Sequence, residues 1–467
     1  MKYFFYFCGA FSKRKFCSNM ANVIKIKKGL DINLKGKAPE GFVNVGKSEN
    51  YAIIPDNFVG ITPKIIARVG DKVKAGSALM IDKANPEIKF VSPVSGEVTA
   101  VNRGEKRKVL SIIVKSDAEI EYEKFDVKDP SSYDAEGLKA VLLESGIWPY
   151  IKQRPYDRVA DPSVAPRDIF ITAYNSAPLA PNFEFAVKGE EDVLQVGLSV
   201  LAKLTAGKVY FGVKAGSSLS TISGVEVVEL QGPHPVGNTG IMINNIKPVN
   251  KGETVWTMNA ADVLFIGRLF KTGKANLSRV IALTGSKMTE RGYAKVTSGC
   301  SISSIVEGKV SFEHTRLISG NVLTGTKVAK DDFLGAYDNH VTAIPEGDDV
   351  NEFLGWGTPG FGKYSVSRTF LSWMSGKSKE YDIDARIRGG ERAMIMSNEY
   401  DKVFPMDILP EYLLKAIIAF DIDKMENLGI YEVAPEDFAL CEFVDTSKIE
   451  LQQIVRQGLD LLYKEVN

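Results

Sequence analysis

A short aromatic and basic segment is the part of the sequence whose side chains could bind a ligand directly. Trp148, Tyr150 and Tyr156 offer flat apolar faces, and Lys152 and Arg154 between them offer cationic hydrogen-bond donors. A quinone head group is flat and carries two carbonyl acceptors, so an aromatic wall beside a donor suits it. The same side chains could instead pack inside the fold or contact another protein of a complex. The five residues are therefore candidate quinone contacts, with packing as the alternative.

Thiol and imidazole chemistry has little to work with in this chain. The four cysteines are Cys8, Cys17, Cys300 and Cys441, and none belongs to a C-x-x-C pair. There is consequently no zinc framework, no disulfide scaffold and no four-cysteine iron–sulfur site, and the cysteine usage indicates a reducing compartment. The three histidines show no H-x-x-x-H spacing, so we expect no catalytic metal. His234, between Gly232-Pro233 and Pro235, is expected to have a structural role in a rigid turn.

Lys83 is the one candidate for a covalently attached group. Asp82-Lys83-Ala84 resembles the tip of a lipoyl hairpin, where a lysine carries the prosthetic group. Pro86 follows closely, and the distance from Lys83 to Pro93 is longer than lipoyl spacing. We therefore expect a solvated, unmodified lysine.

Charge and hydropathy exclude several partner classes. Lys plus Arg and Asp plus Glu both total 58, so the formal net charge is zero. This balance removes the electrostatic argument for nucleic acid and weakens the argument for anionic lipid as the main partner. No run of about 18 apolar residues occurs, so no membrane-spanning helix is expected. An apolar run precedes the basic cluster of residues 13–15, the reverse of a signal peptide; we expect Met20 to be the true start and residues 1–19 to be a non-native or disordered extension.

The periodicity predicts an α/β chain of several domains. Glycine-punctuated strands in residues 64–114 predict a lipoyl-like barrel-sandwich domain, because tight turns favour glycine. Asp168–Ala173, Lys208–Val213 and Val225–Leu230 are predicted strands, and Glu190–Leu204 is a predicted helix closed by Gly207. This alternation indicates a parallel, Rossmann-like sheet.

That Rossmann-like sheet lacks the motifs that bind nucleotides. The loop after its first strand, Tyr174–Pro181, contains two prolines and no glycine, so it offers no close backbone cradle for a pyrophosphate. Neither G-x-G-x-x-G nor Walker A occurs. Further along, Arg279–Gly308 resembles a β-grasp domain of the soluble-ligand-binding (SLBB) type. Pro410–Phe420 and Ile449–Val466 are predicted helices, the second opened by a capping box from Ser447 to Glu450.

The expected domains follow from these patterns. They are a barrel-sandwich β domain at 20–124, a Rossmann-like α/β domain at 125–278, a β-grasp domain at 279–345, and a C-terminal domain with a helical tail at 346–467.

This order resembles the flavin-carrying subunit of respiratory complex I and the cysteine-rich subunit of the Rnf complex, and most closely the NqrA family of the sodium-translocating NADH:quinone reductase. The resemblance runs from about Met20 to the C-terminus. Six motifs in order carry it: Val101–Arg107, Gly232–Gly237, Ile246–Asn250, Gly320–Thr326, Ser365–Leu371 and Pro405–Pro410.

The departures from the flavin-bearing and Rnf relatives carry the functional expectation. Where those relatives have a glycine-rich loop against the flavin phosphate, Ser145–Tyr156 keeps only Gly146 at its start, so we expect no FMN and no NADH oxidation by this chain. Where the Rnf relative has cysteine clusters, only Cys441 remains, and one thiolate cannot hold an iron–sulfur cluster. The candidate quinone contacts would then occupy the vacated flavin pocket, either binding quinone or filling the space.

The resemblance implies a peripheral subunit without a redox cofactor, on the cytoplasmic face of the bacterial inner membrane. Its partners would be the other subunits of the complex, chiefly membrane-embedded ones, which would carry FMN, FAD, riboflavin and iron–sulfur. It would support quinone reduction coupled to Na⁺ export without being catalytic alone. The alternative from the residues is a stand-alone soluble ligand-binding or scaffold protein that uses its β-grasp domain.

Overall fold

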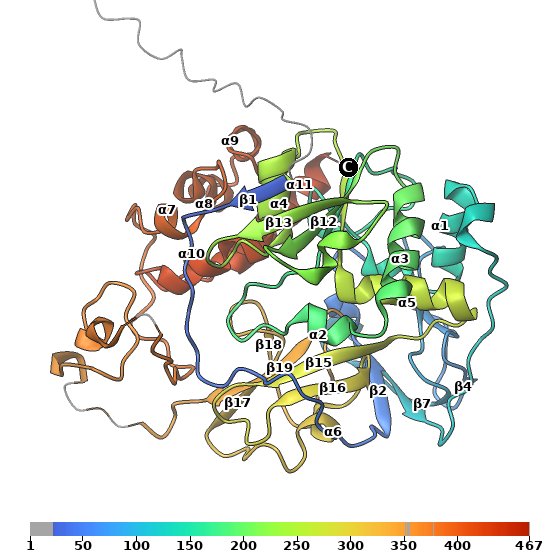
Figure 1. Ribbon diagram of the computed structural model, residues 1–467, viewed down its shortest axis with the longest axis horizontal. Coiled ribbons are helices and arrows are strands. Elements are labelled where there is room, and N and C mark those ends of the chain that lie inside the picture. The colour runs from blue at the N-terminus through green and yellow to red at the C-terminus, as the bar shows by residue number, and fades with distance from the viewer. Residues whose placement is uncertain (1–21, 351, 353–354, 377, 467) are drawn as a thin grey trace, which may run out of the picture.

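The computed structural model describes residues 22–350, 352, 355–376 and 378–466 (Figure 1). The expected extension at 1–19 and the expected start at Met20 lie outside the described residues.

The N-terminal domain consists of two small antiparallel sheets, as the glycine-punctuated pattern predicts. Their strand orders are β2-β8-β7-β4 and β3-β5-β6. The strands are β2 (Asn50–Ile53), β3 (Pro63–Ile65), β4 (Lys72–Val73), β5 (Ala78–Asp82), β6 (Lys89–Val91), β7 (Gly96–Arg103) and β8 (Val109–Ser116). Gly96, at φ +156°, begins β7 where a Cβ would lie 1.8 Å from the carbonyl oxygen of Lys115, so only glycine fits there.

The second domain is built on a seven-stranded sheet with the order β1-β13-β12-β11-β14-β9-β10. Five of its strands are parallel, namely β1 (Asn22–Lys25), β11 (Ile169–Thr172), β12 (Val209–Lys214), β13 (Glu226–Gln231) and β14 (Val255–Asn259). The strands β9 (Lys152–Arg154) and β10 (Arg158–Val159) add an antiparallel edge. Asn22–Lys25, which the sequence places in the N-terminal domain, thus forms the opposite edge of this sheet, because its backbone pairs with β13.

Both faces of the sheet are covered. On one face, α3 (Glu191–Lys203) and α5 (Ala260–Thr272) cross closely. A Cβ on Gly197 would lie 2.5 Å from the carbonyl oxygen of Val263, and one on Gly267 would lie 2.0 Å from that of Val193, so these glycines permit the crossing. The other face carries α4 (Thr239–Ile246) and the C-terminal helices (Figure 1). The shorter helices of this domain are α1 (Ala135–Glu144) and α2 (Phe183–Val187).

The third domain is a five-stranded sheet with the order β16-β15-β19-β17-β18. Its elements are β15 (Ser278–Thr284), β16 (Gly292–Thr297), α6 (Ile302–Val306), β17 (Thr315–Ser319), β18 (Thr326–Val328) and β19 (His340–Pro345). The central pair, β15 and β19, is parallel while the other pairs are antiparallel, a mixed pattern that fits the predicted β-grasp arrangement.

The helical tail packs onto the α/β sheet. It comprises α7 (Tyr400–Val403), α8 (Pro410–Ile418), α9 (Ile422–Asn427), α10 (Ala439–Val444) and α11 (Leu451–Val466). One hydrophobic cluster joins Phe170 and Leu230 of the sheet to Leu413 and Leu459 of the tail. The neighbours of Phe170 in β11, Ile169 and Ile171, face the other core, which is the alternation expected of a strand buried on both faces.

Most predicted elements are confirmed, while two predicted helix signals are wrong. Helix α3 ends at Lys203 and is capped by Leu204, so Gly207 does not close it; that glycine instead lies against the carbonyl oxygen of Arg167, which a Cβ would approach to 2.0 Å.

The predicted capping box at Ser447 is also wrong. Lys448 has a φ of +58°, a left-handed conformation that breaks the helical path between Ser447 and Glu450. Helix α11 begins at Leu451, and the Glu442 carboxylate on α10 accepts the hydrogen bond from the backbone N–H of Gln452 at 2.8 Å. A tertiary contact therefore supplies the cap that the local sequence was expected to supply.

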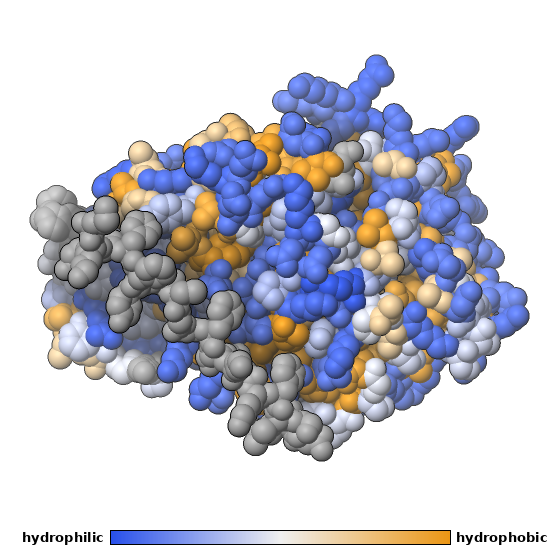
Figure 2. Space-filling model, turned by 90° about the horizontal axis from the view of Figure 1, so that it is seen from above, coloured by the Kyte–Doolittle hydropathy of each residue, from blue (hydrophilic) through white to orange (hydrophobic). Residues whose placement is uncertain are grey.

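In the described part of the chain, no helix is long and apolar enough to cross a membrane. The face seen in Figure 2 is largely hydrophilic, with apolar residues gathered in separate patches.

Candidate functional site

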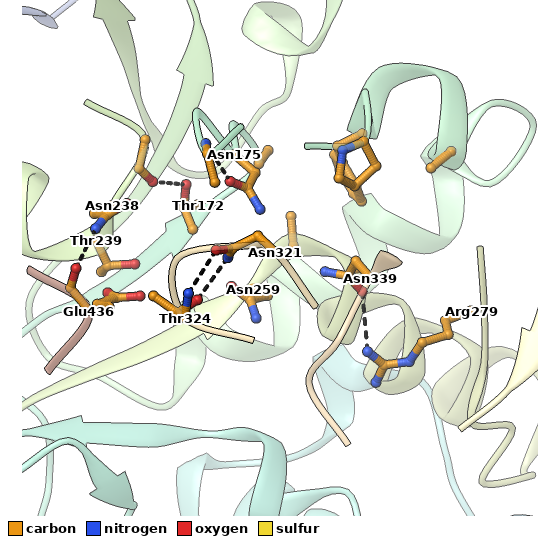
Figure 3. Close-up of a pocket in the computed structure, with 18 of the residues that line it drawn as sticks. Thr172, Asn175, Asn238, Thr239, Asn259, Arg279, Asn321, Thr324, Asn339 and Glu436 are labelled. Carbon is orange, nitrogen blue, oxygen red and sulfur yellow. Dashed lines mark hydrogen bonds between the residues drawn. The ribbon is translucent and has the colours of Figure 1, made fainter. Parts of the chain in front are cut away.

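A crevice opens where the connections of the parallel sheet change direction. The chain leaves β11 toward β12 on one side and returns from β13 to β14 on the other, so the last residues of β11 and β14, Thr172 and Asn259, stand side by side. In open α/β sheets, ligands bind outside the carboxyl ends of the strands at this switch point. The third domain covers the crevice with Asn321, Thr324 and Asn339, as Figure 3 shows.

Neutral hydrogen-bonding side chains dominate this crevice, which has a volume of about 120 Å³. A cavity of about 150 Å³ holds a single aromatic ring, so the space suits one ring and not a whole dinucleotide. Phe183 and Leu264 provide apolar surface. The polar lining comprises Thr172, Asn175, Asn238, Thr239, Asn259, Asn321, Thr324 and Asn339.

Several of these amides are held by their oxygens. The side-chain oxygen of Asn175 accepts from the backbone N–H of Ala177 at 3.0 Å, and that of Asn339 accepts from the Arg279 guanidinium at 3.2 Å. Because each oxygen is engaged, the amide nitrogen of each side chain is the group oriented to donate to a ligand. Helices α4 and α5 also begin at the crevice, with Asn238 and Asn259 as their N-caps, so backbone N–H groups add further donors.

Arg279 fixes the wall between the second and third domains. Its side chain is only 1% exposed, and its guanidinium donates to Asp262 of α5 at 3.0 Å and to the hydroxyl of Ser298 at 3.0 Å. Burial raises the pKa of Asp262 to about 6, although Arg279 opposes that shift. The ion pair therefore joins α5 to β15 and holds Asn339 in place.

A second buried charge cluster closes the other end of the crevice. Arg154 of β9 contacts Asp437 at 2.9 Å and Glu436 at 3.0 Å, both in the tail. Although 44% of the Glu436 side chain is open to the crevice, burial of its carboxyl among protein atoms and the nearby charge of Asp437 raise its pKa to about 7. One guanidinium thus faces two carboxylates, and the cluster retains a proton near neutral pH.

We expect this proton to make stability pH-dependent. Because the folded-state pKa of Glu436 lies above its ordinary value of 4.5, the folded state binds more protons, and stability falls as pH rises from about 4.5 through 7. Glu436→Gln should flatten that slope and leave the variant more stable than the unmodified chain at pH 8. Urea unfolding at several pH values measures this, and an unchanged slope in Glu436→Gln would contradict it.

The five residues predicted to contact quinone do not line this crevice. Trp148 is fully buried, its indole N–H donates to the carbonyl oxygen of Ala160 at 2.8 Å, and its ring packs edge-on against Trp256 at 5.1 Å. Tyr150 is packed against the rings of Phe265 and two further aromatic residues, and burial raises its pKa to about 12.

The remaining three lie on β9 and just after it. Lys152 is half-buried, with its ammonium 4.5 Å from the ring centre of Tyr337, and Arg154 is held in the charge cluster. Tyr156 packs against Tyr463 and lines a separate cavity of about 220 Å³. Their contacts are those of packing residues, and the quinone role of all five stays a prediction.

Sequence reasoning missed the crevice because its residues come from segments far apart in the chain. Two of the six motifs do reach it, Gly232–Gly237 through His234 and Gly320–Thr326 through Asn321 and Thr324. His234 is buried, its Nδ1 lies 2.9 Å from the hydroxyl of Ser176, and burial lowers its pKa to about 4. These motifs were the available signal, although neither contains a residue pattern that specifies a ligand.

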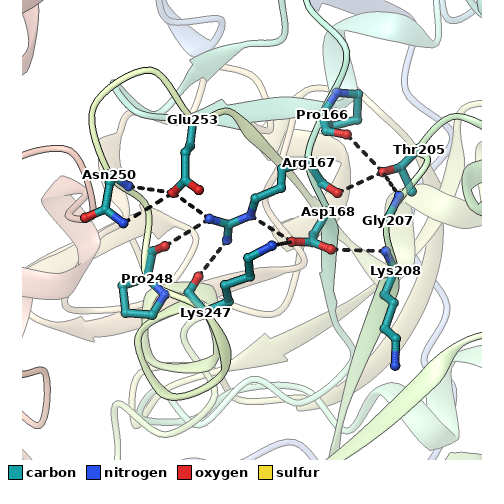
Figure 4. Close-up of polar contacts among 10 residues, drawn as sticks. All are labelled: Pro166, Arg167, Asp168, Thr205, Gly207, Lys208, Lys247, Pro248, Asn250 and Glu253. Atoms are coloured by element: carbon teal, nitrogen blue, oxygen red, sulfur yellow. Dashed lines mark hydrogen bonds and ion pairs between the residues drawn. The ribbon is translucent and has the colours of Figure 1, made fainter.

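The motif Ile246–Asn250 lies at the opposite end of the sheet and is structural (Figure 4). Arg167 donates to Asp168 at 2.8 Å, to Glu253 at 2.6 Å, and to the carbonyl oxygens of the lysine and proline in the motif. Asp168 also accepts from the backbone N–H of Lys208 at 3.1 Å. The network joins the amino-terminal ends of β11, β12 and β14.

The other predicted chemistry finds no support as a second site. Lys83 is exposed at its hairpin tip, while Asp82 is buried and accepts from the backbone N–H of Ala84 at 3.2 Å. Cys300 and Cys441 are buried free thiols in different domains, and burial raises the pKa of each. A surface group of His314, Asp348 and Asp349 is the one metal-like cluster among the described residues.

Comparison with known families gives a consistent result for the whole chain. Residues 24–117 match the NqrA N-terminal barrel-sandwich hybrid domain, residues 133–275 the NqrA second alpha/beta domain, and residues 280–330 the NQRA C-terminal domain. These matches follow the domain order of the structure.

Curated relatives extend the match. The NqrA chain of the Na⁺-translocating NADH-quinone reductase of Pasteurella multocida is 37% identical over 449 residues, and that of Haemophilus influenzae is 38% identical over 451. Each alignment covers 95% of this chain and 100% of the relative. An NAD⁺-reducing [NiFe]-hydrogenase structure covers 65% of this chain and 55% of its own at 10% identity, but its TM-score of 0.34 carries no argument.

The three domains define a chain of the NqrA type. The chain belongs to the NqrA family, whose members are subunits of the Na⁺-translocating NADH-quinone reductase.

Proposed function

We propose that this chain is a peripheral subunit of a Na⁺-translocating NADH:quinone reductase on the cytoplasmic face of the bacterial inner membrane, and that it supports quinone reduction coupled to Na⁺ export. The observation that carries the proposal is the alignment over the full length of relatives named as the NqrA chain of that enzyme. Hydride acceptance, flavin and iron–sulfur chemistry and Na⁺ movement then belong to the partner subunits, chiefly membrane-embedded ones. The chain itself has no redox cofactor in this proposal.

Affinity purification in mild detergent tests the assignment. Native membranes containing the tagged chain should yield a flavin-bearing, NADH-oxidising chain and several polytopic chains, identified by mass spectrometry. Recovery of this chain alone, even after crosslinking, would contradict the assignment and favour a free ligand-binding protein.

Within that function, we infer that a quinone head group contacts this chain in the crevice and not along residues 148–156. The crevice combines amide N–H donors with the apolar surfaces of Phe183 and Leu264, in a space that suits a single ring. The side chains of Trp148 and Tyr150 are buried in packing contacts and would have to leave the core to reach a ligand.

Two substitutions separate these sites in the assembled complex. Asn175→Ala removes one donor from the crevice, and losing a hydrogen bond of about 0.5–1.5 kcal/mol should raise the KM for quinone roughly 2–10-fold. Trp148→Phe keeps an aromatic ring in the core and should leave that KM unchanged. The reverse result, with an effect of Trp148→Phe and none of Asn175→Ala, would return the site to residues 148–156.

A further inference from the structure

The segment of residues 361–379 forms a projecting part of the molecule, here called the apolar-basic lobe. It lies in the orange part of the chain at the left edge of Figure 1. Its sequence contains the basic residues Lys363, Arg368, Lys377 and Lys379 and no Asp or Glu. A chain with zero net charge therefore concentrates positive charge in this lobe; Lys377 is outside the described residues.

The polarity of the lobe is inverted relative to a normal surface. In the short turn of 3-10 helix at Leu371–Ser375, Ser372 is 2% exposed, whereas Trp373 is 53% and Met374 63% exposed. Phe361 is likewise 55% exposed. Large apolar side chains at the tip of a projection contribute little to the core and indicate a surface that another phase or molecule covers.

Separate aromatic residues attach the lobe to the body of the protein. The Tyr364 ring lies 5.2 Å from that of Tyr381 and 5.9 Å from that of Phe443 on α10. Tyr381 in turn exchanges backbone hydrogen bonds with the segment near Leu34, at 2.8 and 2.9 Å. The exposed apolar side chains are thus free to contact something else while the lobe stays anchored.

Charge identifies the kind of surface that fits. Arg368 is exposed, and Lys363, although it pairs with Glu352 at 2.8 Å, leaves the lobe itself without any carboxylate. Tryptophan, phenylalanine and methionine next to basic residues match the interface of an anionic bilayer, where aromatic rings sit at the headgroup level and cations attract acidic lipids.

We propose that the apolar-basic lobe inserts into the headgroup region of an anionic lipid bilayer. A bilayer fits better than a protein partner because the apolar groups stand on a convex tip with an irregular backbone, which a deformable interface accommodates without a matching groove. The proposal goes beyond membership of the complex, since it assigns to this chain its own contact with lipid. It does not depend on quinone binding.

Vesicle sedimentation of the purified full chain tests the proposal. Binding should be stronger to phosphatidylcholine vesicles that contain phosphatidylglycerol than to phosphatidylcholine alone, and high salt should weaken it. Arg368→Gln should weaken binding about fivefold, the effect of one cation at the surface. The pair Trp373→Ser and Met374→Ser should weaken it about tenfold or more, since the inserted apolar area is lost.

Matched controls lie in the N-terminal domain. Lys106→Gln removes an exposed charge from another basic stretch, and Val69→Ser removes an apolar side chain that is 61% exposed. Both should bind vesicles as the unmodified chain does. Equal binding by lobe and control variants, or no preference for phosphatidylglycerol, would overturn the proposal. If vesicles are not bound but the lobe variants lose co-purifying membrane chains, the lobe contacts protein and the lipid proposal is wrong.

Discussion

Replacing Arg279 by methionine should lower the free energy of unfolding by about 3–5 kcal/mol, the usual cost of removing one partner from a buried ion pair. The substitution leaves the Asp262 carboxylate, which is fully buried, without its cation. It also removes the donors that hold Ser298 and Asn339, so the junction between the second and third domains loses its polar connection. Urea unfolding followed by tryptophan fluorescence measures the loss.

Two variants test the reason for this effect. Lys295→Met, in the adjacent strand, removes an exposed cation that lies 3.7 Å from Glu190, and should cost less than about 1 kcal/mol. Adding Asp262→Asn to Arg279→Met removes the uncompensated charge and should recover part of the stability. If the double variant is as unstable as Arg279→Met alone, lost packing and not the unpaired carboxylate explains the cost.

The second large effect is expected at Arg154, which connects the sheet to the tail. Arg154→Met leaves Asp437 buried and unpaired beside Glu436, and should also cost about 3–5 kcal/mol at pH 8. The cost should be smaller at pH 5.5, because carboxylates without a cation can bind protons. Limited proteolysis should show that cleavage in the tail becomes faster.

Lys251 offers a matched control for that contact. It also joins the second domain to the tail, through Glu426 at 2.7 Å, but its side chain is 62% exposed. Lys251→Met should therefore change stability by less than about 1 kcal/mol. A similar cost for Lys251→Met and Arg154→Met would mean that burial of the ion pair is not what makes Arg154 important. Arg154→Met with Asp437→Asn should be more stable than Arg154→Met alone.

Several elements of the fold were predictable because local patterns specify them. The apolar run at β11 and the i, i+4, i+7 leucines of α3 fix a buried strand and an amphipathic helix without reference to distant residues. The capping box at Ser447 failed for the opposite reason: Asp445 accepts from the backbone N–H of Ile449 at 2.8 Å, and Glu442 caps α11, so contacts from the preceding helix override the local signal.

The candidate site was much less predictable. Trp148 and Arg154 attracted attention because aromatic and cationic side chains often bind ligands, but the same side chains are also those that fill cores and form buried ion pairs. The asparagines of the crevice give no local signal, since asparagine is common at helix caps and turns. Asn238 and Asn259 do occupy N-cap positions, which is a sufficient local reason for their presence.

By itself, the sequence determined the family, the order of the domains and most of the regular elements, because motifs and periodicity are local properties of the chain. Only the tertiary structure decided that Asn22–Lys25 joins the sheet of the second domain, that Arg154 is buried against the tail, and that residues between 172 and 436 meet in one crevice. Such contacts depend on strand order and on burial shared between distant segments, and no short stretch of sequence encodes either.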